Sequence, residues 1–175
     1  MPPDICFAEK KKSEFIIEQR ILSGIEITIS DNQNVLSVDR LQVEQTVRHV
    51  LQKMNVSKAE VSLALVDDEV MRKLNEKYLQ DATPTDVISF DLGDTDASQI
   101  NKLDCEVIVN AQCALRVTRE HTGNPQAELN LYIVHGLLHH LGYNDQTKKQ
   151  AKTMHEMENQ LLEELGFGNV FGGTG

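Results

Sequence analysis

Four short segments of the chain have the residue pattern of β-strands, in which apolar and polar side chains alternate or β-branched residues dominate. The first, residues 25–29, alternates throughout as Ile-Glu-Ile-Thr-Ile and ends at the turn-forming run of residues 31–34. The others are residues 60–66, 87–90 and 105–109. We therefore expect about four strands.

Five segments are expected to be helices, most of them because their apolar residues recur at a period of about 3.6. Asp39 and Asn124 precede two of them, and both residue types accept hydrogen bonds from the free N–H groups of a first helical turn. Pro125 suits the first position of a helix, and Gly142 suits a helix end because glycine adopts the left-handed conformation without strain. The expected helices run from Asp39 to about Met54, from Asp67 and Asp68 past Tyr78, from Ala111 to about Glu120, from Asn124 to Leu141, and from about Thr147 to Leu165.

Strands interleaved with helices in a chain of 175 residues predict one small sheet with helices packed on it. We expect the α+β class, with a single mixed sheet of about four strands and about five helices, and an α/β arrangement is the alternative. The sequence further predicts a single domain over residues 24–166. Residues 1–23 are then an N-terminal extension, and the glycine-rich residues 167–175 a flexible tail.

Composition narrows the class of protein. The apolar fraction of 40% is enough for one core and argues against two independent domains. Three cysteines without a C-x-x-C spacing argue against a disulfide framework or a thiolate zinc site and favour a reducing cytoplasm. The sequence has neither an apolar stretch long enough for a membrane span nor a recognisable secretion signal, so no membrane partner is expected. The formal net charge of −10 counts against nucleic-acid binding, although the local potential at a site decides.

Residues 135–145 carry the candidate chemistry. Residues four apart on a helix have β-carbons roughly 5–6 Å apart on one face, so His135 and His139 can direct their imidazoles at one ion. Gly142 then lets the chain turn back without steric strain, and Asp145 follows as a third ligand. Three protein ligands leave a fourth position for water, which is typical of a catalytic site, and a bound ion lowers the pKa of that water toward ~7. We expect one divalent metal, zinc first, with nickel and manganese as alternatives, and no assignable catalytic group beyond the metal-bound water.

An ordinary core or surface role is the alternative for this histidine pair, because two histidines four apart on a helix are common. The glycine and the carboxylate that follow are what favour a metal site. His140 points about 100° away from His139 around the helix and is not expected to be a ligand. His49 and His121 carry no signal, while His155 on the last helix is a weaker alternative ligand.

The stretch 135–145 resembles the signature of the YbeY family of rRNA-processing endoribonucleases, H-G-x-L-H-L-x-G-Y-D-H. A second block is similar to the family's L-N-x-x-Y followed by P-T-D/N-V-L-S-F. Here the chain has Leu-Asn-Glu-Lys-Tyr at residues 74–78 and Pro-Thr-Asp-Val-Ile-Ser-Phe at residues 84–90. The order and separation of the two blocks also match, so the likeness spans about residues 25–165.

The resemblance implies a metal-dependent endoribonuclease of rRNA maturation and ribosome quality control. Its partners would be RNA and the ribosome, with no DNA and no predicted oligomeric state, and its location the cytoplasm. The resemblance also implies that His135 and His139 bind the metal and that position 145 completes the set. The family has aspartate and histidine at positions 144 and 145, where this chain has Asn144 and Asp145. Aspartate is a competent zinc ligand, but it is shorter, anionic and less selective.

A second departure concerns the substrate. The family usually places arginine directly after the tyrosine of L-N-x-x-Y, where an arginine can bind a phosphate, and this chain has Leu79 there. We expect Arg72, Thr85, Asp86 and Ser89 to contact the substrate. The alternative is a solvated helix face for the arginine and turn chemistry around the neighbouring proline for the other three.

Two other functions remain open. A ribosome- or RNA-binding factor with weak or lost nuclease activity is favoured by Leu79, by Asp145 and by the acidic composition. A metalloprotease would share the ligand spacing, but it needs a glutamate directly after the first histidine as general base. Because the chain has Gly136 at that position, we consider a metalloprotease the weaker alternative.

Overall fold

Four strands form one sheet in the computed structural model of the protein, which describes residues 24–93, 102–121 and 123–168. In chain order they are β1 (Ile25–Asp31), β2 (Lys58–Val66), β3 (Val87–Asp91) and β4 (Lys102–Asn110). Their order in the sheet is β1-β2-β4-β3, with β1, β2 and β4 parallel and β3 antiparallel to β4. All four predicted strands are therefore present, and β2 and β4 begin earlier than predicted.

The five predicted helices are also present among the described residues: α2 (Arg40–Lys53), α3 (Asp68–Leu79), α4 (Ala111–His121), α5 (Pro125–His140) and α6 (Lys148–Glu164). The predicted starts are confirmed, because the side chain of Asp39 accepts hydrogen bonds from two backbone N–H groups of α2. Asn124 does the same for one N–H group of α5, and Pro125 is its first residue.

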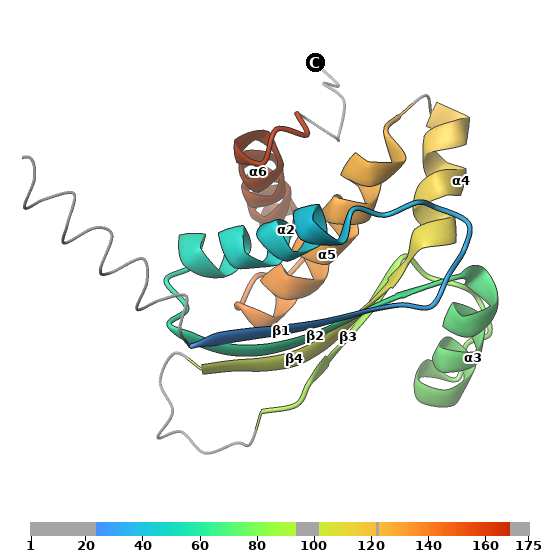
Figure 1. Cartoon of the computed structure of the whole chain (residues 1–175), viewed down its shortest axis with the longest axis horizontal. Coiled ribbons are helices and arrows are strands. Elements are labelled where there is room, and N and C mark those ends of the chain that lie inside the picture. Colours follow the sequence, from blue (N-terminus) through green and yellow to red (C-terminus); the bar gives the residue numbers. More distant parts are fainter. Residues whose placement is uncertain (1–23, 94–101, 122, 169–175) are drawn as a thin grey trace, which may run out of the picture.

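The sheet has one thick and one thin covering layer. Helices α2, α4, α5 and α6 lie on one face, while α3 stands on the other face near one end of the sheet (Figure 1). Strand residues alternate between the two faces accordingly, so that Val107 faces the larger core and Ile108 the smaller one. The single mixed sheet and its five helices confirm the predicted α+β class.

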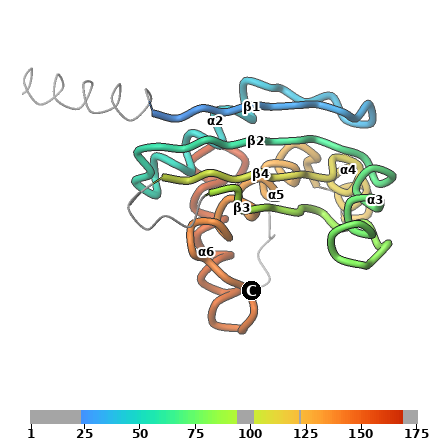
Figure 2. The backbone as a smooth tube through the Cα atoms, turned by 90° about the horizontal axis from the view of Figure 1, so that it is seen from below, coloured from blue at the N-terminus to red at the C-terminus, as the bar shows by residue number. Residues whose placement is uncertain are grey.

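Helix α5 runs through the middle of the thick layer, against β3 and β4 and in contact with α2, α4 and α6 (Figure 2). A helix surrounded in this way needs apolar residues on most of its sides. Its fully or nearly buried residues meet that need: Ala127, Leu129, Leu131, Tyr132, Ile133, Val134, Leu137 and Leu138.

Gly136 packs directly against the sheet. A β-carbon at this position would lie 2.8 Å from Cγ1 of Val107 and 3.1 Å from Cγ2 of Val87. The first contact is shorter than real β-carbons show and the second is unusually tight, so the absence of a side chain allows the helix to lie this close to the two strands.

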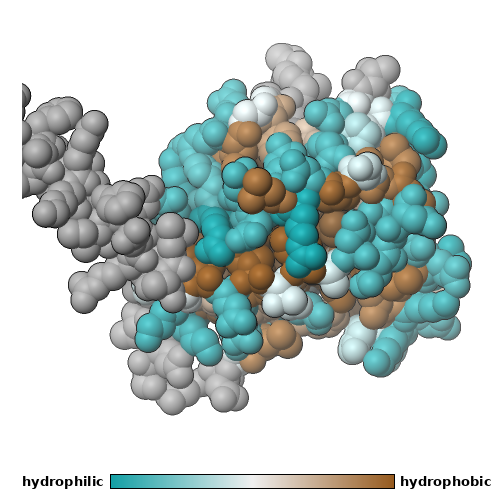
Figure 3. Space-filling model, in the orientation of Figure 1, coloured by the Kyte–Doolittle hydropathy of each residue, from teal (hydrophilic) through white to brown (hydrophobic). Residues whose placement is uncertain are grey.

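The surface of the described residues is mixed in character. On the face drawn in Figure 1, apolar side chains reach the surface in patches among hydrophilic ones (Figure 3). None of the described helices has the length and apolar character that crossing a bilayer requires.

The predicted ends of the domain lie partly outside the described residues, since 1–23 and 169–175 do. Phe167, which the sequence places in the tail, packs partly buried against the larger core, and its N–H group donates to the carbonyl of Leu162 at 2.9 Å.

Candidate metal centre

The three predicted metal ligands lie together where α5 ends. The Nε2 atoms of His135 and His139 are 3.0 Å apart, and Oδ2 of Asp145 lies 3.9 Å from the first and 4.0 Å from the second. The two rings meet edge to face at an angle of 84°. These residues form the one group of three or more potential metal-ligating side chains found in the described part of the chain.

The end of α5 is built as the sequence predicts. Leu141 caps the helix, Gly142 follows with a φ angle of +92°, and the N–H group of Tyr143 donates to the carbonyl of Leu138 at 3.0 Å. This is the pattern in which a left-handed glycine closes a helix and reverses the chain. The reversal brings Asp145 back toward the two histidines of the preceding turns.

The distances fit an ion of the expected kind. A point equidistant from the two Nε2 atoms and Oδ2 lies about 2.1 Å from each, within the usual range for zinc bound to nitrogen or oxygen. Two imidazoles and one carboxylate are also a donor set that zinc, nickel and manganese accept. The side chains are 25%, 32% and 44% exposed for His135, His139 and Asp145, so the space in front of them is open to solvent.

Glu158 of α6 is a member of the site that the sequence analysis missed. Its Oε1 lies 2.7 Å from Nδ1 of His135, and its side chain is 0% exposed. A signal was present in the sequence, because Glu158 stands four residues after Met154 and three before Leu161, on the buried row of the helix. A carboxylate in such a row requires a polar partner, which the sequence alone does not identify.

The charges around His135 act on its pKa in opposite directions. Burial alone lowers the pKa, but the hydrogen bond and charge of Glu158, with the charges of Asp86 and Asp145, outweigh burial and raise it. The neighbouring His140 differs, since burial lowers its pKa and its Nε2 has no hydrogen-bond partner among the described residues. The group of three potential ligands includes neither His140 nor His155.

Asp86 is a predicted substrate residue whose charge acts on the metal centre, because it raises the pKa of His135. Its Oδ1 accepts hydrogen bonds from the hydroxyl of Thr85 at 2.9 Å and from the N–H group of Val87 at 2.8 Å. Ser89 lies two residues further along β3 than Val87 and therefore on the same face of the sheet, toward α5. Ser89 thus lies on the side of the sheet that carries the site, and the charge of Asp86 acts on His135.

A buried asparagine fixes the loop that holds these residues. Asn110, at the end of β4, donates from Nδ2 to the carbonyl of Thr85 at 3.0 Å and to Oδ1 of Asp68 at 2.7 Å. Its own N–H group donates to the carbonyl of Asp86 at 2.8 Å. The position of Asp86 is therefore set by the sheet and by α3 together.

Arg72 and Leu79 lie on α3, on the other side of the sheet from α5 (Figure 1). Arg72 is exposed and shares a shallow hollow with residues of α3 and with Gln112 of α4. Leu79 is the last residue of α3 and is 58% exposed. The structure does not bring Arg72 into the group formed by the three ligands.

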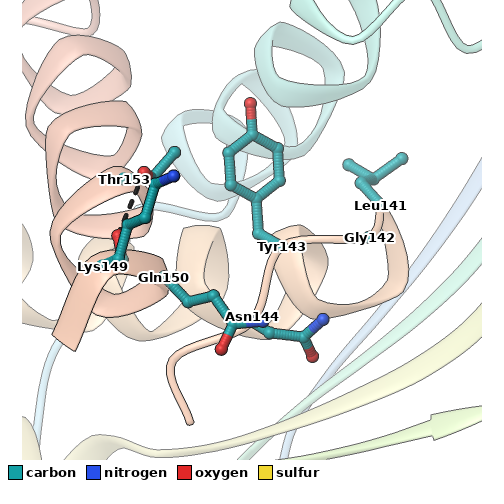
Figure 4. A pocket seen from close by; sticks show the side chains of 7 residues that line it. All are labelled: Leu141, Gly142, Tyr143, Asn144, Lys149, Gln150 and Thr153. Atoms are coloured by element: carbon teal, nitrogen blue, oxygen red, sulfur yellow. Dashed lines mark hydrogen bonds between the residues drawn. The ribbon is translucent and has the colours of Figure 1, made fainter. Parts of the chain in front are cut away.

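The loop after α5 borders a hollow of about 430 Å³. Figure 4 shows the side chains of Leu141 and Tyr143 on one side of this loop and that of Asn144 on the other. The opposite wall comes from the first turns of α6. Its residues there are Lys149, Gln150 and Thr153.

The position after the first histidine cannot hold a general base. Gly136 faces Val107 and Val87 of the sheet rather than the open side of the site, and even a β-carbon would meet them. A metalloprotease of the usual kind needs a glutamate there. The packing thus supports the sequence argument against that activity.

These features define an α+β protein with a candidate metal centre at the end of its most buried helix. The family profile described as Endoribonuclease YbeY matches residues 28–166. The chain belongs to the YbeY family of endoribonucleases, as the two sequence blocks predict.

Individual relatives agree with this assignment. The chain is 36% identical to Endoribonuclease YbeY of Protochlamydia amoebophila, over 75% of this chain and 87% of the relative. It is 34% identical to the Endoribonuclease YbeY of Bacillus velezensis, over 80% of this chain and 95% of the relative. It is 32% identical to that of Syntrophus aciditrophicus, over 78% of this chain and 87% of the relative. A solution structure of a protein from Thermotoga maritima has a similar fold, with a TM-score of 0.59 and 24% identity over 79% of this chain and 88% of that one.

Proposed function

We propose that the protein is a metal-dependent endoribonuclease that cuts ribosomal RNA during its maturation and quality control in the cytoplasm. Membership of the family and the names of its relatives support RNA cleavage. The observation that carries the metal dependence is the convergence of His135, His139 and Asp145 on one point. Zinc is the proposed ion.

Each residue of the site has a distinct task in this proposal. The imidazoles of His135 and His139 and the carboxylate of Asp145 hold the ion. When bound there, a divalent ion would supply Lewis-acid chemistry, polarising a phosphoryl oxygen and lowering the pKa of water toward ~7. The open side of the three ligands admits the phosphodiester, and the sheet side, closed by Gly136, excludes it.

Local charge supports the need for an ion. Asp86 and Asp145 both act on His135, and Glu158 lies behind it, so the ligand group itself is acidic. A phosphodiester is also an anion and would be repelled from such a site. A bound dication is the largest local charge and reverses the sign, even in a chain whose formal net charge is −10.

Substrate contacts complete the proposal. Thr85, Asp86 and Ser89 line the approach beside β3, and the hollow bordered by Tyr143 and Lys149 offers an aromatic ring and a cation to an unpaired nucleotide. Arg72 remains a predicted contact for RNA more distant from the scissile bond.

A ribosome- or RNA-binding factor with weak cleavage is the second candidate. It is favoured by Leu79, an exposed apolar residue where the family usually has an arginine. Leucine cannot bind a phosphate oxygen, so this chain lacks one expected source of transition-state stabilisation.

Cleavage of a structured fragment of ribosomal RNA by the purified chain, with and without added zinc, tests the proposal. We expect cuts that disappear after treatment with a chelator, return with zinc, and are absent in His139→Ala. His121→Ala, which changes an exposed histidine at the end of α4, is the matched control and should cut normally. A chain that binds metal and RNA but leaves the RNA intact would favour the binding factor instead.

A further inference from the structure

Glu158 is a carboxylate in the centre of an apolar core. Met154, Leu161 and Leu162 of the same helix are fully buried around it, and its side chain is 0% exposed. Oε1 meets Nδ1 of His135 at 2.7 Å, whereas Oε2 has no hydrogen-bond partner among the described residues. His135 therefore supplies the hydrogen bond that this buried carboxylate makes.

Stability does not account for such a residue. Moving a carboxylate out of water is costly, and a single hydrogen bond with one oxygen left over compensates for only part of that cost. Replacing a buried ionic pair by apolar residues of similar size is often neutral or stabilising. Since Glu158 contributes little to the stability of the fold, we look for its role in the chemistry of its partner, His135.

That partner needs a fixed ring. A neutral imidazole carries its proton on either nitrogen, and only the form protonated on Nδ1 presents a lone pair on Nε2. In this structure Nε2 of His135 is the atom that faces His139 and Asp145, and Nδ1 is the atom that faces Glu158. Because Glu158 approaches the far nitrogen, it does not belong to the ligand group itself.

We propose that Glu158 is the positioning residue of the candidate metal centre. Its carboxylate accepts the Nδ1–H of His135, holds the ring in the form that offers Nε2 to the ion, and fixes the direction in which that lone pair points. This inference rests on the metal site of the proposed function. Carboxylates in this position behind a ligating histidine also raise its basicity.

Two substitutions in the full-length chain test the proposal. Glu158→Met keeps the volume and removes the acceptor, and we expect it to lower zinc affinity by about 10- to 100-fold in competition with a chelator. Glu158→Gln keeps a neutral acceptor oxygen and should restore part of the affinity. At alkaline pH, where His135 is neutral, the metal-free Glu158→Met protein should be as resistant to urea as the wild type, or more so. Glu163→Met and Glu163→Gln, on the exposed side of α6, are matched controls and should bind zinc normally.

A nuclear magnetic resonance measurement separates positioning from a purely structural role. Long-range proton–nitrogen spectra of the His135 ring at alkaline pH should show Nδ1 protonated in the wild type and a mixture of both forms in Glu158→Met. Equal zinc affinity of wild type and Glu158→Met would overturn this inference alone. A loss of affinity that comes with lost stability and an unchanged ring would overturn it as well. A wild-type chain that binds no zinc would overturn the metal site and this inference together.

Discussion

The two halves of the candidate metal centre are held in different ways. His135 and His139 project from α5, which is packed against two strands and three other helices. Asp145 stands on the loop between α5 and α6, and its side chain is 44% exposed. The helix half inherits its geometry from the core, whereas the loop half depends on one glycine and a few exposed residues. Asp145, the ligand position at which this chain differs from the family's pattern, lies in the loop half.

Removing one ligand from each half should give the largest effect. We expect His139→Ala to lower zinc affinity by more than about 100-fold, since the loss of a ligand costs more than the loss of its support. Asp145→Ala should lose less, about 10-fold, because an exposed position lets water replace the carboxylate. Competition titrations with a chelator measure both. Equal losses would show that the loop half is as well ordered as the helix half.

Adding a methyl group at the helix–sheet contact is the next largest test. Gly136→Ala should lower the free energy of unfolding by about 1–3 kcal/mol, because the new β-carbon meets the stiff side chain of Val107. Urea denaturation measures this change. The displacement of α5 should also lower zinc affinity, and an unchanged affinity would mean that the helix half tolerates movement.

The same substitution in the loop half is a matched test with a different cause. Gly142→Ala meets no atom within 4 Å, so its expected cost of about 1–2 kcal/mol comes from the φ angle of +92° alone. Urea denaturation again gives the value. An unchanged free energy of unfolding in Gly142→Ala would mean that the loop relaxes into another conformation. Zinc affinity should then fall although stability does not.

The smallest expected effect is a dependence of stability on pH. The pKa of His135 is raised in the folded, metal-free protein, so its interaction with Glu158 stabilises the fold fully below about pH 6.5, the usual value for unfolded histidine. That contribution is lost as the pH rises through the folded-state pKa. Unfolding of wild type and His135→Gln across this range measures it, with His121→Gln as control. A difference that grows with rising pH would contradict the assignment.

Much of the fold was predictable because local chemistry determines it. Alternation of apolar residues gave the strands, and Asp39, Asn124 and Gly142 gave helix ends that the structure confirms. The order of the strands was not predictable, since pairing of β4 with both β2 and β3 depends on contacts between distant parts of the chain.

The candidate metal centre likewise has a part that the sequence predicts and a part that it does not. Its three expected ligands lie within eleven residues of sequence, so their spacing on one helix and one turn was sufficient to bring them together. Glu158 belongs to another helix and reaches His135 across the core. Sequence spacing says nothing about such a contact, although a charged residue in an apolar row shows that one exists.

The close packing at Gly136 also affects the orientation of the His135 and His139 imidazoles. One residue added to or removed from α5 ahead of His135 would turn both His135 and His139 by about 100° around the helix axis relative to the preceding part of the helix. Such a turn would also bring a bulkier side chain to the place where only a hydrogen atom fits against Val107. The contact at Gly136 thus fixes the rotation of α5 about its own axis. The same contact sets the direction in which the imidazole rings of His135 and His139 project.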